Sequence, residues 1–186
     1  MSSPSRPCPV LRTARLTLAP HTPDDLADCL AMWSDPVVVR YMGGIPATPR
    51  EVWDRILRYA GLWSLFGYGY WRVGETATGR FVGDVGLGEF RREITPSILG
   101  VPEAGWSFMP WAHGRGYARE AAGAMLAWAD EALLDARTVC MIHPDNVASL
   151  ALASRLGFEI YARTQYKDRP ELLLRRYAVR NPPDAS

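Results

Sequence analysis

The segment Pro110–Ala118, with the sequence PWAHGRGYA, constrains the fold of this chain more than any other. It follows an apolar run, Glu103–Met109, that is typical of a β-strand, and it leads into a long amphipathic run, Arg115–Leu134, with helical periodicity. Backbone N–H groups at the start of a helix point outward, and the helix dipole favours negative charge there. Gly114 and Gly116 let an anion approach the backbone closely. The sequence therefore predicts a phosphate-bearing ligand at a strand-to-helix turn.

Two well-known glycine-rich loops fit this segment poorly. A P-loop requires GxxxxGK[ST] to hold terminal phosphates and magnesium, and the chain has no such run. The dinucleotide-binding fingerprint begins correctly at Gly114 and Gly116, but Arg119 stands where a small residue must allow close helix–strand packing. The loop also lies past the middle of the chain, which leaves too little sequence for a doubly wound fold. Both observations disfavour a Rossmann-type nucleotide enzyme.

Composition points to a single globular domain spanning residues 1–186, with the polar, proline-rich residues 1–9 frayed. The net charge is +1, so no overall basic field attracts nucleic acid or a membrane surface. We find neither an apolar run as long as a membrane span nor an apolar signal core at the N-terminus. The three cysteines have no pairing or metal-binding spacing, so we expect a reducing cytoplasm and no metal site.

The hydrophobic periodicity alternates between strand and helix patterns along the chain. Strands are expected at Val10–Ala19, Tyr68–Glu75, Phe81–Phe90, Glu103–Met109, Thr138–Ile142, Phe158–Gln165 and Leu172–Tyr177. Helices are expected at 22–33, 48–66, 115–134 and 146–156, with a short helical turn over Val37–Met42. Two of these helices begin with a Thr-Pro pair followed by acidic residues, which is a strong N-terminal signal. A polar excursion, 91–101, interrupts the sheet pattern.

This element order, together with four motifs, resembles the GNAT superfamily of N-acetyltransferases. The motifs are LRTARLTLAP, SDPVVVRYMGG, EAGWSFMPWAHGRGYAREA and NVASLALASRLGF, and their combination is most similar to the branch that modifies ribosomal-protein alanine N-termini. The family's pyrophosphate loop is Gln/Arg-x-x-Gly-x-Gly/Ala, and His113 replaces its first residue here. The resemblance implies an α/β (α+β) fold with about four helices. Its mixed, mostly antiparallel, twisted sheet has six to seven strands and is split by a V-shaped cleft.

The resemblance also implies acetyl-CoA as co-substrate and direct attack of a primary amine on the thioester in a ternary complex. Backbone amides of the loop would hold the pyrophosphate, and the main chain of the preceding strand would pair with the pantetheine arm. Asn146 and Ser149 lie on one face at the start of the late helix. In similar proteins they contact pantetheine and the sulfur, although Asn146 equally suits a helix cap. The expected cofactor residues are Phe108, Met109, His113, Gly114, Arg115, Gly116, Tyr117, Ala118, Arg119, Asn146 and Ser149.

Two residues are expected to take part in proton transfer. Glu103 opens the central strand where several relatives carry a catalytic glutamate, and it is the first choice as general base, acting through water. The alternative is a structural ion pair at the strand end. Ser149 is the candidate proton donor to the leaving thiolate. Asp84 and Glu89 are reserve bases, and strand alternation allows at most one of them to face the cleft.

Acceptor-side residues are expected from the first helices and the strand after them. We place Tyr41, Trp71 and Glu89 there, with the condition that only one of Tyr70 and Trp71 can face the cleft. The acceptor is expected to be a protein N-terminus or a small-molecule amine, and the protein a monomer or homodimer. A non-catalytic acyl-CoA sensor of the same fold remains the alternative function.

Overall fold

The computed structural model describes residues 7–133 and 137–178. Most of the frayed segment predicted at 1–9, and the predicted last helical residue Leu134, lie outside these ranges. The elements of the first half are β1 (Leu11–Arg12), β2 (Leu16–Ala19), α1 (Leu26–Trp33), α2 (Pro36–Val39), α3 (Pro49–Phe66), β3 (Tyr70–Glu75) and β4 (Phe81–Gly88). Those of the second half are β5 (Glu103–Phe108), α4 (Tyr117–Ala132), β6 (Arg137–Ile142), α5 (Val147–Arg155), β7 (Glu159–Tyr166) and β8 (Arg169–Tyr177).

One eight-stranded sheet connects these elements in the order β1-β2-β3-β4-β5-β6-β8-β7. Every neighbouring pair is antiparallel except β5 and β6, which are parallel. The expected mixed, mostly antiparallel α/β architecture is therefore confirmed. The described residues form eight strands, where six to seven were expected, and five α-helices, where about four were expected. The extra strand arises because the run predicted as one strand folds back on itself, with Thr13 N–H donating to the Leu16 carbonyl at 2.9 Å.

The helix starts follow the sequence signals closely. Thr48 and Glu51 form a reciprocal capping box, with the Thr48 N–H 2.8 Å from Glu51 Oε2, and Pro49 occupies the first helical position of α3. Gly67 ends α3 with a φ of 70°, a conformation that glycine adopts without strain. The predicted helical turn at Val37–Met42 is the short helix α2, which Asp35 caps through the Val37 N–H.

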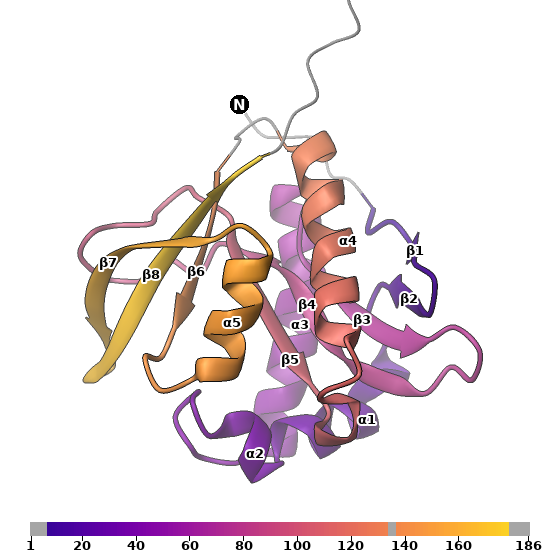
Figure 1. Ribbon diagram of the computed structural model, residues 1–186. Coiled ribbons are helices and arrows are strands. Elements are labelled where there is room, and N and C mark those ends of the chain that lie inside the picture. The colour runs from indigo at the N-terminus through magenta and orange to yellow at the C-terminus, as the bar shows by residue number, and fades with distance from the viewer. Residues whose placement is uncertain (1–6, 134–136, 179–186) are drawn as a thin grey trace, which may run out of the picture.

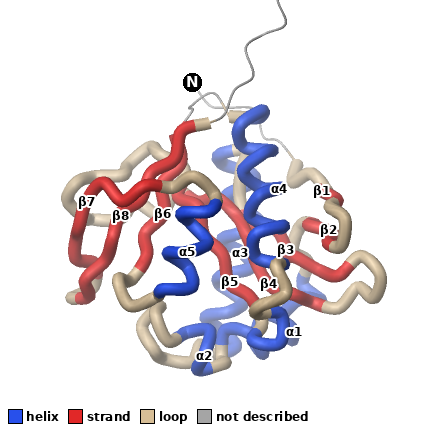
Figure 2. The backbone as a smooth tube through the Cα atoms, in the orientation of Figure 1, coloured by secondary structure: helices blue, strands red, loops and turns tan. Residues whose placement is uncertain are grey.

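The helices form two layers around the sheet. Figure 1 shows α3 behind the sheet and α4 and α5 in front of it, and Figure 2 shows the same helix–strand–helix arrangement by colour. The main core contains three indoles, with Trp63, Trp71 and Trp128 in edge-to-face contact at 4.7–5.3 Å. In the described residues, we find no helix that is long and apolar enough to cross a membrane.

The sheet opens between its two halves. The parallel strands β5 and β6 share one register pair, Glu103 with Val139, and they diverge beyond it, as Figure 1 shows. The Val139 N–H also donates to the Pro102 carbonyl at 3.1 Å, so this junction is the point at which the strands separate. The split places an open wedge next to the start of α5 and leaves the strand edges of β5 and β6 with free pairing capacity.

Candidate active site

A cavity of about 930 Å³ lies at the split in the sheet. Its walls come from β5 and β6, the start of α5, helices α1 to α3, the segment after β4 and the β7–β8 turn. The wall on β5 is formed by the five residues Glu103 to Ser107. Residues from both halves of the chain therefore converge on one space of the size that small-molecule sites have.

The glycine loop lies outside this cavity, at the N-terminus of α4. Gly114 and Gly116 have φ angles of 74° and 79°, which require glycine, and Gly116 is the N-cap of the helix. Arg15 holds the loop from outside: its Nη1 donates to the Arg115 carbonyl at 2.9 Å, and its guanidinium pairs with Glu120 at 2.6 Å. The loop is thus preformed, with its backbone amides at the positive end of a 16-residue helix.

His113 and Tyr117 are engaged within the protein. The His113 Nε2 lies 3.0 Å from the Phe108 carbonyl, so the ring ties the loop to the end of β5. The Tyr117 hydroxyl donates to Glu75 at 2.7 Å, and this bond is the main reason that its pKa is raised. Their side chains therefore support the loop, while the expected phosphate contact of Tyr117 rests on its main-chain amide. Arg115, by contrast, lies on the exposed surface beside Trp111.

Asn146 and Ser149 meet at the first turn of α5, at the edge of the cavity. Asn146 is the N-cap, and its Oδ1 accepts from the Ser149 N–H at 3.2 Å, so the capping role weighed from the sequence is present. The Trp106 indole donates to the Ser149 Oγ at 3.3 Å across the split between β5 and α5. Because the Ser149 oxygen accepts this bond, its own proton remains able to donate to a group in the cavity.

Glu103 forms a two-pronged ion pair. Its oxygens accept from Arg92 Nε and Nη2 at 2.6 and 2.8 Å, and its side chain is 8% exposed. Such a paired geometry is the strong form of a carboxylate–guanidinium contact. The structural alternative considered for Glu103 is therefore present, and a proton taken up by this carboxylate would weaken the pair.

Glu171 is a cavity residue that the sequence reasoning missed. It lies on β8, opposite Thr164 of β7, and is 8% exposed. Burial raises its pKa to about 7, and the nearby Glu103 carboxylate adds to that rise. Glu171 is the last residue of KDRPE, which looks like a simple hairpin turn in the sequence, so nothing there marked it as a cavity residue.

Of the three residues expected on the acceptor side, two line the cavity and one does not. Tyr41 and Glu89 line the cavity, and the Tyr41 ring stacks on His143 across the mouth at 5.7 Å. Trp71 was wrongly chosen over Tyr70: it is fully buried against Trp63 and Trp128, whereas Tyr70 lines the cavity. The alternation along β3 decides this, because successive side chains point to opposite faces of the sheet.

Of the two reserve bases, Glu89 lines the cavity and Asp84 does not. Asp84 is completely buried on the α1 side of the sheet, where it accepts from the Trp33 indole at 3.2 Å and pairs with His21 at 3.1 Å. The donor atoms of His21, Cys29 and Asp84 lie within 4.8 Å of one another. The two ring nitrogens of His21 face Asp84 and Cys29 separately, which makes the group a polar core cluster.

Comparison with known proteins agrees with this fold and site. Residues 15–159 match the family model of the acetyltransferase (GNAT) domain. A structure assigned to the GnaT-family acetyltransferases of Bordetella pertussis is 31% identical with a TM-score of 0.81, covering 91% of this chain and 99% of that one. Ribosomal-protein-S5-alanine acetyltransferase from Vibrio fischeri is 18% identical with a TM-score of 0.69, covering 95% and 100%. Spermidine N-acetyltransferase from Vibrio cholerae, in complex with CoA and spermine, is 14% identical with a TM-score of 0.70, covering 89% and 97%.

The chain therefore belongs to the GNAT acetyltransferase family, and it is an acetyl-transferring enzyme. The two more distant structures, both below 25% identity, share the fold, so the similarity to the ribosomal-protein branch goes no further than that. The family match excludes the dinucleotide-binding alternative. This agrees with Arg119, which stands where the dinucleotide-binding fingerprint requires its third small residue.

Proposed function

We propose that this enzyme moves the acetyl group of acetyl-CoA to a primary amine by direct attack in a ternary complex. The observation that carries the proposal is the split between β5 and β6, with a preformed glycine loop at one end and a mixed-charge cavity at the other. A donor with a diphosphate and a long amide-bearing arm matches this layout. The diphosphate binds the amides of Gly114 to Ala118, with Arg115 and Arg119 supplying charge.

The pantetheine arm then occupies the wedge as an added strand. Its amides pair with the main chain of β5 near Phe108 and Met109, in the manner of β-strand addition. The His113 ring already contacts the Phe108 carbonyl, and the Met109 N–H already donates to the Val82 carbonyl at 2.9 Å, so the remaining β5 groups carry more of this pairing. The thioester reaches the cavity beside Ser149, whose hydroxyl donates to the departing thiolate while Trp106 holds its oxygen in place.

The attacking amine must be neutral. For an α-amino group with a pKa near 8, losing the proton at pH 7 costs about 1 kcal/mol. Glu171 is better suited to accept that proton than Glu103, because a buried carboxyl with a pKa raised to about 7 is poised for general-base work. Glu103, paired with Arg92, holds the segment after β4 against the cavity.

Kinetics of Glu171→Gln test this assignment. We expect kcat to fall about 100-fold or more, which is the typical contribution of a general base. The wild-type kcat should rise with pH through about 7, because the base works when Glu171 has lost its proton, and the variant should lose this limb. Thiol release from acetyl-CoA with a panel of amines measures both.

Glu159→Gln serves as the control, and Glu103→Gln tests the competing assignment of the base. Glu159→Gln changes an exposed glutamate at the start of β7, away from the cavity lining, and should keep the wild-type profile. If Glu103→Gln removes the pH limb and Glu171→Gln does not, Glu103 is the base. CoA binding without thiol release by any amine would instead favour the acyl-CoA sensor.

A further inference from the structure

The charges around the cavity are unbalanced. Three carboxylates line it, from Glu89, Glu103 and Glu171, against six cationic side chains. The cations are Arg55, Arg58, Arg91, Arg92, Lys167 and Arg169. One of the carboxylates is already committed to Arg92, and the Glu89 oxygens accept from the backbone N–H groups of Arg91 and Gly100. The cavity as a whole therefore favours an anionic ligand group.

The two arginines on α3 show this imbalance most clearly. Within residues 7–133 and 137–178, neither Arg55 nor Arg58 forms a salt bridge. The Arg55 guanidinium lies 3.6 Å from the centre of the Trp33 ring, and its Nε is buried without a hydrogen-bond partner. The ring fixes the guanidinium plane, so its donors are held at the cavity without a carboxylate to receive them.

Arg58 lies in the same electrostatic environment. Its guanidinium and that of Arg92 both approach the Phe90 ring, at 5.7 and 5.0 Å from the centre. Arg58 is exposed on α3, yet partial desolvation by the neighbouring protein lowers the pKa of its guanidinium, and repulsion from Arg55 and Arg92 adds to the effect. Arg55, Arg58 and Arg92 thus line the same cavity, and only Arg92 is paired with a carboxylate, that of Glu103. A bound anion would relieve the repulsion among the three guanidinium groups.

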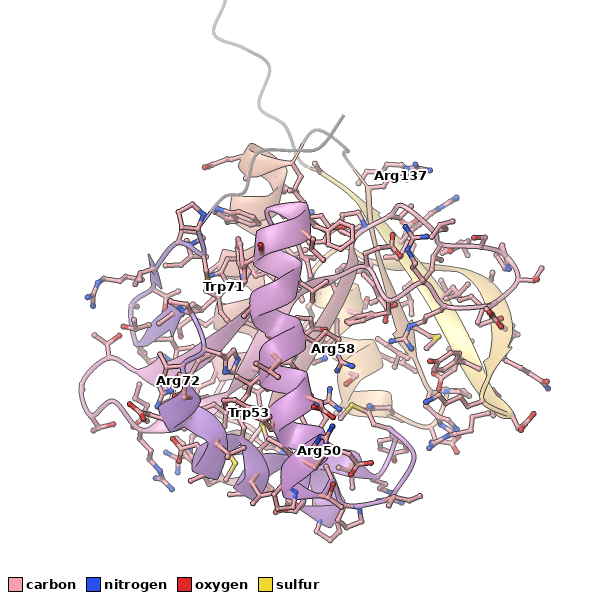
Figure 3. All side chains as sticks on the ribbon, turned by 180° about the vertical axis from the view of Figure 1, so that it is seen from behind. Arg50, Trp53, Arg58, Trp71, Arg72 and Arg137 are labelled. Atoms are coloured by element: carbon pink, nitrogen blue, oxygen red, sulfur yellow. The ribbon has the colours of Figure 1, made fainter. Side chains whose placement is uncertain are left out.

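The position of these arginines separates them from the expected diphosphate site. They belong to α3, which covers the sheet face opposite α4 and its glycine loop. Figure 3 shows Arg58 and Trp71 on opposite sides of α3, with Arg58 on the flank turned toward the β6–β8 half of the sheet. The loop residues 113–118 do not line the cavity, so the α3 arginines face the acceptor and not the phosphates of the donor.

We propose that Arg55 and Arg58 form an anion subsite, and that the acceptor is a small amine carrying a carboxylate or phosphonate group, as α-amino acids and aminophosphonates do. This inference rests on the proposed function. The anion binds the two α3 guanidinium groups, and the amine points toward Glu171 and the thioester. Polyamines are disfavoured because they would bring several further positive charges into a cavity that is already lined by an excess of cationic side chains.

Matched acceptor pairs test the subsite. A panel of amino acids, each with its own carboxamide, an aminophosphonate, and spermidine are compared by thiol release from acetyl-CoA. For the wild type we expect the acids to exceed their amides in kcat/KM by roughly 10- to 100-fold, the usual effect of a charge-assisted hydrogen bond. Arg58→Gln should remove most of that preference, lowering kcat/KM for the acids and changing it less than about threefold for the amides.

Arg50→Gln is the matched control. Arg50 lies on the same helix but pairs on the surface with Asp54 and does not line the cavity, so its variant should keep the wild-type preference. Arg58→Lys should prefer acids over amides more than Arg58→Gln does, and less than the wild type does, because lysine returns the charge without the planar fork of arginine. Unfolding midpoints of the variants show whether the fold is retained.

Equal use of acids and amides by the wild type, a preference for spermidine, or equal losses for both members of each pair in Arg58→Gln would overturn the subsite while leaving the proposed function intact. Thiol release with none of the acceptors would instead contradict the proposed function. In that case calorimetric titration of N-acetyl amino acids and their amides into the CoA complex decides the subsite. Tighter binding of the acids, lost in Arg58→Gln, supports it, and equal binding overturns it.

Discussion

At the scale of single residues, the buried carboxylate of Asp84 supports the packing between the sheet and the first helix. Asp84 has no exposed surface. Its Oδ2 accepts from the Trp33 indole at 3.2 Å, and its Oδ1 lies 3.1 Å from His21 Nε2 without forming a hydrogen bond. Removal of this acceptor leaves the buried Trp33 indole N–H without its partner, which costs more than the bond itself contributes. The same carboxylate joins β4 to α1, and α1 carries part of the wall that faces the acceptor.

We expect Asp84→Ala to lower the free energy of unfolding by about 2–4 kcal/mol. Asp54→Ala is the control, because it removes a carboxylate from an exposed i,i+4 pair with Arg50 and should change stability by less than about 0.5 kcal/mol. Urea denaturation measures both. Equal stability of the two variants would show that the Asp84 cluster contributes nothing.

At the scale of elements, the turn from β5 into α4 depends on backbone conformation more than on side chains. His113 secures one end of the turn on the Phe108 carbonyl, and Arg15 secures the other on the Arg115 carbonyl. Between them, Gly114 and Gly116 supply the left-handed residues that turn the amides outward. The proposed anion site therefore depends on the loop as a unit.

Gly116→Ala should be strained, because a left-handed backbone costs an alanine about 1–2 kcal/mol and an added Cβ would stand 3.4 Å from Arg15 Nη2. We expect lower stability and at least tenfold weaker CoA binding in calorimetry. Gly123→Ala, inside α4 and with open space around the new Cβ, should instead gain up to about 1 kcal/mol. Unchanged CoA affinity in Gly116→Ala would contradict the assignment of the loop.

At the scale of the whole molecule, the split sheet leaves strand edges that a bound ligand would complete. β5 and β6 share a single register pair, so few strand-to-strand bonds join the two halves of the sheet, and side-chain contacts such as Trp106 with Ser149 bridge the split. A ligand lying in the wedge would pair with free strand edges and link the halves. Binding to the folded state alone then stabilises it by mass action.

CoA at 100 times its dissociation constant should stabilise the fold by about 2.7 kcal/mol. For a protein of this size the melting temperature should rise by roughly 5–10 °C. NAD at the same concentration should leave it unchanged. A thermal melt with each ligand makes the comparison, and stabilisation by NAD in place of CoA would contradict the assignment of the glycine loop to CoA.

Local signals made much of the fold predictable. The Thr-Pro helix starts, the apolar runs of the hairpin strands and the glycines before α4 act within a few residues. The sequence therefore determined the element order and the family, and it indicated the loop proposed for the diphosphate. The first strand was misjudged because a two-residue β1 and its reversal carry no periodic signal.

Contacts between distant segments were decided by the tertiary structure alone. The pairing of Arg92 with Glu103, the burial that raises the pKa of Glu171 on β8, and the choice of Tyr70 over Trp71 all depend on which faces meet across the sheet. The positive charge of the cavity wall was also decided by the tertiary structure, because arginines from α3 and from the segment after β4 come together at the Phe90 ring when the chain folds. Charge interactions depend on distance in space, and spacing along the chain does not fix that distance.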